Sequence, residues 1–100
     1  MTATIGDAAR AYAVRDLGET ARLCLEIIAT DPAHFDALHL LGVVCTNRGQ
    51  FADGVSYLLR ARALRADDGR LHANLGSAFG AVLTIAGAMA RRPGSVRALP

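Results

Sequence analysis

The sequence predicts an all-α fold built from stacked antiparallel helix pairs. A Leu-Gly pair recurs at a spacing of 34 residues, first as Leu41-Gly42 and again as Leu75-Gly76. A fixed period of this length is typical of helix–turn–helix units that stack into an array. The composition agrees, because 52% of the 100 residues are hydrophobic and only 5% are aromatic. Such a composition suits helices that pack closely through alanine and aliphatic side chains.

The same register organises the whole chain, which is the length of one small domain. We expect a helical repeat domain over 1–90, followed by an irregular C-terminal tail over 91–100, because Arg91-Arg92-Pro93-Gly94 stops a helix. The domain divides into three units: 1–34, 35–68 and 69–90.

Unit two shows the clearest pattern. Leu38, Leu41, Gly42 and Cys45 have the i, i+3, i+4, i+7 spacing of an amphipathic helix. Gly49 is suited to the left-handed residue that ends this helix. A second helix should follow, with an apolar set formed by Phe51, Val55, Leu58, Leu59 and Leu64.

Unit one repeats this plan most clearly in its second half. The segment 15–19 matches the turn that begins at Gly49, and Asp31-Pro32 ends the second helix, because a residue before proline avoids the helical region. The first helix, over 3–13, is weaker and is expected to fray, since Asp7 and Ala8 stand where the other units have leucine and glycine.

Unit three begins with a helix that Asp67-Asp68-Gly69 should cap. Leu83 replaces the glycine expected at the next turn, which leaves Thr84 or a shifted Gly80 to provide the turn before a second helix over 86–90. Because this second helix is short, the apolar face of unit three should be uncovered. Exposed apolar faces favour self-association or a bound partner.

The patterns Leu38-x-x-Leu41-Gly42-x-x-Cys45 and His72-x-x-Leu75-Gly76-x-x-Phe79, together with Pro32, resemble the tetratricopeptide repeat over about residues 1–82. The resemblance implies a short right-handed superhelix whose first helices line a concave groove for a peptide or a partner protein. Gly42 and Gly76 are each predicted to let a neighbouring helix approach closely, because a glycine inside a helix otherwise costs about 1 kcal/mol relative to alanine.

The resemblance also implies which residues line the groove, namely those on the exposed face of each first helix. Asn74 stands where some family members have an asparagine that hydrogen-bonds a peptide backbone, and Arg70 suits a ligand carboxylate. The supporting residues of the family's basic carboxylate clamp are missing here. The full candidate set is Tyr12, His39, Val43, Thr46, Asn47, Arg70, Asn74 and Ser77.

Catalytic and nucleic-acid functions find little support in the sequence. The net charge of +2 is too small to indicate nucleic-acid binding, and no Gly-x-Ser-x-Gly, phosphate-loop or paired-carboxylate motif is present. His34, His39 and His72 lack further ligands at the spacing of a metal site. We therefore expect no enzyme activity, no metal and no cofactor.

The cysteines and the N-terminus indicate a cytoplasmic protein. Cys24 and Cys45 lie on apolar stripes of neighbouring helices, as free buried cysteines commonly do. The first ten residues lack the basic and apolar regions of a secretion signal.

Two alternatives remain beside a protein-interaction module. The phrase 36–42 is typical of bacterial repeat proteins, some of which have a glycosyltransferase or sulfotransferase region downstream, so the chain is alternatively the repeat region of such a larger protein. A small membrane-tethered protein is the other alternative, because residues 71–90 are uncharged and contain Gly76-x-x-x-Gly80. His72, Asn74 and Thr84 weaken the membrane interpretation.

Overall fold

The computed structural model describes residues 3–90, and this part of the chain is helical with no strands. The helices are α1 (Ile5–Ala13), α2 (Leu17–Thr30), α3 (Phe35–Asn47), α4 (Phe51–Leu64) and α5 (Gly69–Ala90).

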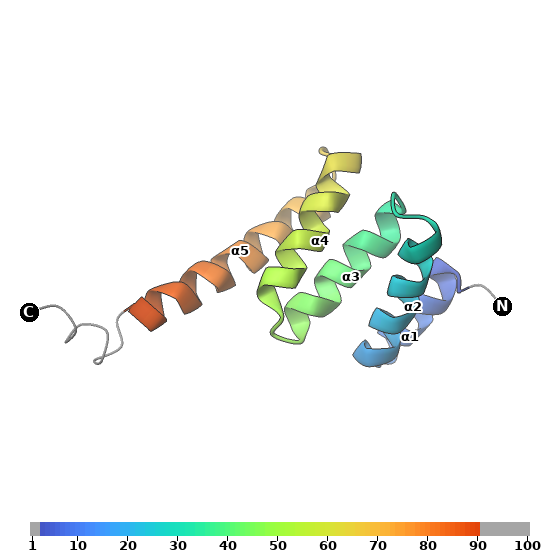
Figure 1. The fold of residues 1–100 in the computed structure, drawn as a ribbon, viewed down its shortest axis with the longest axis horizontal. Coiled ribbons are helices and arrows are strands. Elements are labelled where there is room, and N and C mark those ends of the chain that lie inside the picture. Colours follow the sequence, from blue (N-terminus) through green and yellow to red (C-terminus); the bar gives the residue numbers. More distant parts are fainter. Residues whose placement is uncertain (1–2, 91–100) are drawn as a thin grey trace, which may run out of the picture.

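Each helix packs against the next one in the chain, and successive helices reverse direction (Figure 1). The first helices of neighbouring units also touch, because α1 contacts α3 and α3 contacts α5. The prediction of an all-α chain with packed neighbouring helices is therefore confirmed.

Polar side chains cap the start of four of the five described helices, and Asp16 does so at α2 by accepting from the Glu19 N–H. Thr4 and Asp7 form a capping box at α1, in which each side chain accepts a hydrogen bond from the other residue's backbone N–H. The Nδ1 atom of His34 accepts from the Ala37 N–H at the start of α3. Asp68 accepts from the Leu71 N–H at 3.0 Å, which confirms the predicted cap of the helix in unit three.

The turn between α3 and α4 depends on Gly49, whose φ of +80° is the left-handed conformation predicted for it. Only glycine adopts this conformation without a steric cost. The chain can therefore reverse directly after Asn47 and begin α4 at Phe51.

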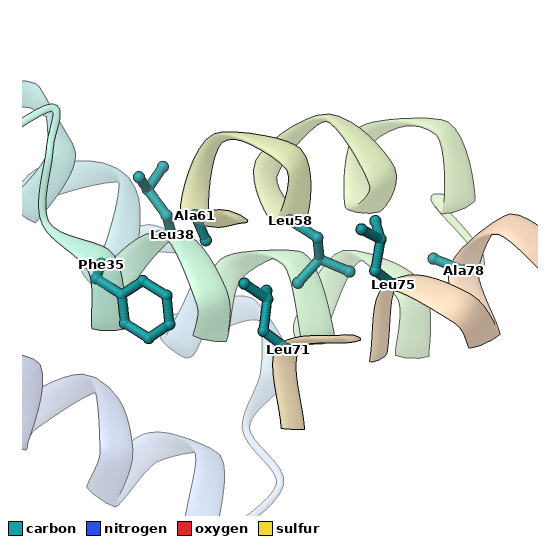
Figure 2. Packing of buried hydrophobic residues seen from close by; sticks show 7 residues of the cluster. All are labelled: Phe35, Leu38, Leu58, Ala61, Leu71, Leu75 and Ala78. Carbon is teal, nitrogen blue, oxygen red and sulfur yellow. The ribbon is translucent and has the colours of Figure 1, made fainter. Parts of the chain in front are cut away.

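The core consists of two adjoining clusters of buried side chains. The first lies between α3, α4 and α5 and contains Phe35, Leu38, Leu58, Ala61, Leu71, Leu75 and Ala78 (Figure 2). The second joins α1, α2 and α3 and contains Ala8, Ala21, Cys24, Leu41, Val44 and Cys45. Ile28 and Tyr57 pack against both clusters, so the two form one continuous core.

The apolar set predicted for α4 is only partly buried. Leu58 is fully buried, but Leu59 and Leu64 are exposed by 39% and 44%. The other buried residues of α4 are Gly54 and Ala61, which have little side-chain volume. This helix therefore packs by close backbone approach, and its larger leucines are left partly in solvent.

Gly42 allows that close approach, as predicted. A Cβ atom added at Gly42 would lie 2.5 Å from the Cγ of Leu58 and 3.2 Å from the carbonyl oxygen of Gly54. One added at Gly54 would lie 3.1 Å from the Gly42 carbonyl oxygen. The two glycines thus face each other where α3 and α4 meet.

The same prediction for Gly76 is wrong. A Cβ atom added at Gly76 would meet nothing within 4 Å. Gly42 is covered because α4 folds back over α3, whereas within residues 3–90 no helix folds back over the corresponding side of α5. The 34-residue register aligns Gly76 with Gly42, but the described residues contain no helix that covers Gly76 as α4 covers Gly42.

The predicted turn in unit three is also wrong, because α5 runs without a break from Gly69 to Ala90. Leu83 stands where the previous unit has Gly49, and a positive φ is costly for leucine. Thr84 does not turn the chain but returns its hydroxyl to the Gly80 carbonyl oxygen at 2.8 Å, within the helix. The tail predicted over 91–100 lies outside the described residues.

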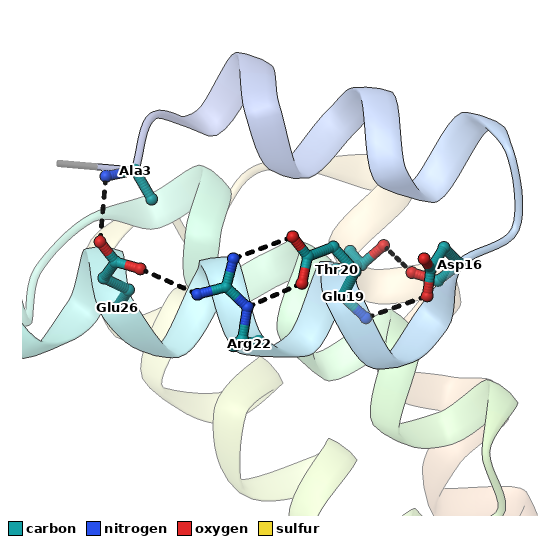
Figure 3. A network of polar contacts seen from close by, with 6 residues as sticks. All are labelled: Ala3, Asp16, Glu19, Thr20, Arg22 and Glu26. Atoms are coloured by element: carbon teal, nitrogen blue, oxygen red, sulfur yellow. Dashed lines mark hydrogen bonds and ion pairs between the residues drawn. The ribbon is translucent and has the colours of Figure 1, made fainter. Parts of the chain in front are cut away.

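A polar network stiffens the outer side of α2 (Figure 3). Arg22 donates two hydrogen bonds to Glu19, at 2.7 and 2.8 Å, and a longer one to Glu26. Glu26 also accepts from the Ala3 N–H, which ties the segment before α1 to α2. The hydroxyl of Thr20, a buried polar residue, donates to the Asp16 carbonyl oxygen at 2.7 Å.

Candidate binding groove

The first helices of the three units together form a groove of about 440 Å³. Five of the residues predicted for the binding face lie in it: Tyr12, His39, Val43, Arg70 and Asn74. Four further lining residues were not predicted: Ile5, Ala9, Asp36 and Leu40.

The 34-residue register explains why these side chains meet. On α3, Asp36, His39 and Val43 follow one another at about one-turn spacing, on a different side from the buried Leu38 and Leu41. Because α1, α3 and α5 are successive first helices in contact, equivalent positions of each helix come to the same side.

The four lining residues that were not predicted could have been found from the same 34-residue register. Ile5 and Ala9 lie 34 positions before His39 and Val43, and Asp36 lies 34 positions before Arg70. Extending each predicted groove position to the neighbouring unit would have found them.

His39 and Asn74 join α3 to α5 across the groove. The Nδ2 atom of Asn74 lies 2.8 Å from the Nε2 atom of His39. If the amide N–H donates, the imidazole is neutral and carries its proton on Nδ1. The ring of His39 also meets the edge of Phe35, with ring centroids 5.7 Å apart.

Burial lowers the pKa of His39, which favours this neutral form. Among the neighbouring charges, Asp68 and Asp36 act to raise the pKa of His39, while Arg70 acts to lower it. The hydrogen bond to His39 uses part of the hydrogen-bonding capacity of Asn74 within the protein. The rest of that capacity is available to a ligand.

Tyr12 lies in the α1 wall of the groove, beside the end of α3. Its hydroxyl accepts a hydrogen bond of 3.4 Å from the Nδ2 of Asn47, and the Arg15 guanidinium lies 5.2 Å from its ring centroid. Asn47 itself is exposed and is not a lining residue. This hydrogen bond to Tyr12 is its contact with the groove lining.

Besides Asn47, two predicted groove residues lie outside the lining set. Thr46 points between α3 and α4, because its hydroxyl donates to the Gly42 carbonyl oxygen at 2.9 Å and would meet a Cβ added at Gly54. Ser77 is exposed on α5 outside the lining set. The prediction for Thr46 is wrong because α4 packs closely against the side of α3 on which Thr46 lies.

The groove combines apolar side chains with a few polar groups of both signs. Ile5, Leu40 and Val43 provide aliphatic surface, while Asp36 and Arg70 add one negative and one positive charge. Such a mixture suits a ligand with an apolar side chain beside charged or hydrogen-bonding groups.

The remaining histidines and the cysteines have roles within the fold. His34 caps α3, and the His72 ring contacts the Ala66 carbonyl oxygen. In the described chain, no group of three or more His, Cys, Asp or Glu side chains is arranged to hold a metal ion. Cys24 and Cys45 are free and buried, and burial raises the pKa of the Cys24 thiol to about 11.

A second hollow, of about 430 Å³, arises from the continuation of α5. It lies between the α3–α4 turn, the start of α4 and the later part of α5, which contributes Val82, Ile85 and Ala86. By length and composition alone, α5 is also long and apolar enough to cross a membrane.

Comparison with protein-family models, curated proteins and solved structures found no match to this chain. The resemblance to the tetratricopeptide repeat therefore depends on the 34-residue register and on the packing of the helix pairs.

Proposed function

We propose that the chain is a tetratricopeptide-like interaction module without catalytic activity. In this proposal the helix pairs form a short right-handed superhelix, and the groove formed by α1, α3 and α5 binds a segment of a partner protein. The supporting observation is that Tyr12, His39, Val43, Arg70 and Asn74, predicted from three separate stretches of sequence, line one groove.

The lining residues favour a particular kind of segment. An aliphatic side chain of the ligand would pack on Ile5, Leu40 and Val43. A carboxylate beside it would pair with the guanidinium of Arg70, which binds carboxylates through two parallel hydrogen bonds. The favoured ligand is therefore a short peptide segment that places an acidic residue next to an aliphatic one.

Selection from a random peptide library displayed on phage tests this proposal. The 100-residue protein should enrich peptides that contain an aliphatic residue next to Asp or Glu. Arg70→Glu should reduce the enrichment of these peptides and instead enrich peptides that contain Lys or Arg, because it reverses the charge at this position of the groove. Arg70 is exposed, so the substitution should leave the helical circular dichroism and the melting temperature nearly unchanged.

Arg62→Glu is the matched control, since it reverses an exposed arginine on α4 that does not line the groove. It should enrich the same peptides as the unaltered protein. Failure to enrich any peptide family, or enrichment of the same family by Arg70→Glu, would contradict the proposal.

A further inference from the structure

One side of α5 exposes a row of residues spaced alternately by four and three positions. We call it the open face, and it comprises His72, Gly76, Phe79, Leu83, Ala86 and Ala90, all of them exposed. This spacing keeps one helix in continuous contact with a second helix. In unit two, the equivalent residues Leu38, Gly42 and Cys45 are buried.

The open face is separate from both the core and the groove. Leu71, Leu75 and Ala78 point into the first core cluster, and Arg70 and Asn74 line the groove. At 100° per residue, the open face lies roughly opposite the groove side of α5. Its large apolar side chains are Phe79, exposed by 41%, and Leu83, exposed by 70%.

We propose that the open face is covered by α5 of a second copy of this chain, with the two helices antiparallel about a twofold axis. The second copy supplies the covering helix that unit two obtains from α4. This pairing is isologous, so each copy uses the same residues and the interface closes as a dimer.

The charge pattern along the chain favours this orientation. Residues 71–90 contain no Asp, Glu, Lys or Arg. Asp67, Asp68 and Arg70 come just before this segment and together carry a net charge of −1, and Arg91-Arg92 follows it in the sequence. Antiparallel pairing brings opposite charges to the same end of the helix pair, whereas parallel pairing would bring like charges together.

The side-chain sizes along the open face fit the same arrangement. When the twofold axis crosses α5 at the height of Ala81, whose position is on the opposite side of the helix, Phe79 of one copy faces Leu83 of the other. Gly76 then faces Ala86, so the two central contacts pair large with large and small with small, whereas the outermost contact sets His72 against the small Ala90. Each of these contacts occurs twice, once on each side of the axis.

Insertion of α5 into a lipid bilayer explains the open face less well than pairing with a second copy. The first half of α5 is fixed in the core by Leu71, Leu75 and Ala78. From Phe79 to Ala90 only 12 residues remain, which as a helix span about 18 Å. The hydrocarbon core of a bilayer is about 30 Å thick.

Sedimentation equilibrium of the 100-residue protein tests the dimer directly. We expect a monomer–dimer equilibrium within the range of about 1 μM to 1 mM. Leu83→Glu should weaken dimerisation by about a hundredfold or more, because it places two unpaired carboxylates in an apolar interface. Its monomer should stay folded by circular dichroism, since Leu83 is exposed. Leu25→Glu is the matched control, because Leu25 is exposed by 46% on α2, and it should dimerise like the unaltered protein.

Disulfide formation tests the orientation. A mixture of Gly76→Cys and Ala86→Cys copies should form a mixed disulfide under mild oxidation, and neither variant alone should cross-link efficiently. The native Cys24 and Cys45 are buried and should not interfere.

Four results would overturn the proposal. These are a monomer at every concentration, a dimer unaffected by Leu83→Glu, efficient cross-linking of Gly76→Cys with itself, and flotation of the protein with phosphatidylcholine–phosphatidylglycerol vesicles. None of these results would contradict the proposed binding of a peptide in the groove, because the groove and the open face share no residue.

Discussion

At the scale of single residues, Gly42 and Gly76 form a natural matched pair. They occupy the same place in the 34-residue register, yet Leu58 and Gly54 crowd the first and nothing lies near the second. Any effect of helix propensity is common to both, so the difference between them isolates the close contact of α3 and α4.

Alanine substitution should separate the two glycines. Gly76→Ala should raise the free energy of unfolding by up to about 1 kcal/mol through helix propensity. Gly42→Ala should lower it by about 1–3 kcal/mol, because the buried Leu58 must move. Urea unfolding of dilute protein, followed by circular dichroism, measures both. Equal stabilisation by the two substitutions would show that α3 and α4 are not in close contact.

The buried thiols predict how stability depends on pH. Burial raises the pKa of Cys24 to about 11, and it also raises that of Cys45, from an ordinary value of 9.0. Between these pH values the unfolded chain loses thiol protons that the folded chain retains. Stability should therefore fall as the pH rises from about 9 to 11, by up to about 1.4 kcal/mol per pH unit from Cys24, and the raised pKa of Cys45 acts in the same direction.

Urea midpoints measured across this pH range check the thiol prediction, with Cys24→Ala as the control. The variant should show a shallower decline than the unaltered protein, since one raised pKa is removed. The tyrosines are common to both proteins and cancel in the comparison. Parallel slopes would show that Cys24 is not buried as described.

At the scale of elements, α5 is one helix with two environments. Its first part is held in the core by Leu71, Leu75 and Ala78, whereas the part after Phe79 projects beyond the other helices (Figure 1). Local stability follows packing, so a helix with few buried contacts opens more readily than its covered neighbour.

Amide hydrogen exchange should reveal this difference. In dilute protein, residues 82–90 should exchange at least tenfold faster than residues 71–78, because their opening exposes little additional apolar surface. Raising the protein concentration should slow exchange in 82–90 if the open faces pair. Uniform protection along α5 in a demonstrated monomer would contradict the description of the later half as unsupported.

The elements also show what the sequence could predict. Units one and two have the right periodicity, and the turn at Gly49 and the cap at Asp68 were found where expected. Unit three was misjudged, because Thr84 and Gly80 were assigned a turn that neither residue requires. A helix continues unless something stops it, and the segment from Gly80 to Ala90 contains no proline and no residue with positive φ.

The groove was predictable to a similar extent. Five of its members, among them the aliphatic Val43, could be found from the exposed faces of single helices. Asp36 and three apolar members, Ile5, Ala9 and Leu40, were missed, because the predicted positions on each first helix were not extended to the neighbouring units through the 34-residue register. Thr46 was misplaced because the sequence does not show how closely α4 approaches α3.

At the scale of the whole molecule, the helices form an elongated body of 60 × 28 × 22 Å rather than a sphere. Because each helix contacts mainly its neighbours in the sequence, those contacts provide most of the stability of the described residues. Here the two core clusters share Ile28 and Tyr57, so loosening one removes packing from the other.

The molecule should therefore unfold as one unit. Tyr57→Phe leaves Tyr12 as a fluorescent reporter in α1, and Tyr12→Phe leaves Tyr57 as a reporter in α4. In each variant, urea midpoints from fluorescence and from circular dichroism should coincide. Leu38→Ala, which should cost about 2–5 kcal/mol, should shift both reporters together. Earlier loss of the Tyr12 signal would show that α1 and α2 unfold separately.

The contrast between Gly49 and Leu83 also bears on how such arrays change length. The two residues stand one repeat apart, and Arg15 stands one repeat before Gly49. Arg15 and Gly49 both have a positive φ where the chain folds back, whereas α5 continues through Leu83. The chain therefore folds back where this register position has a positive φ and continues as one helix where it does not, with no insertion or deletion in the register. A helix that continues in this way presents an uncovered face, and another subunit can be fitted to that face by evolution or by design.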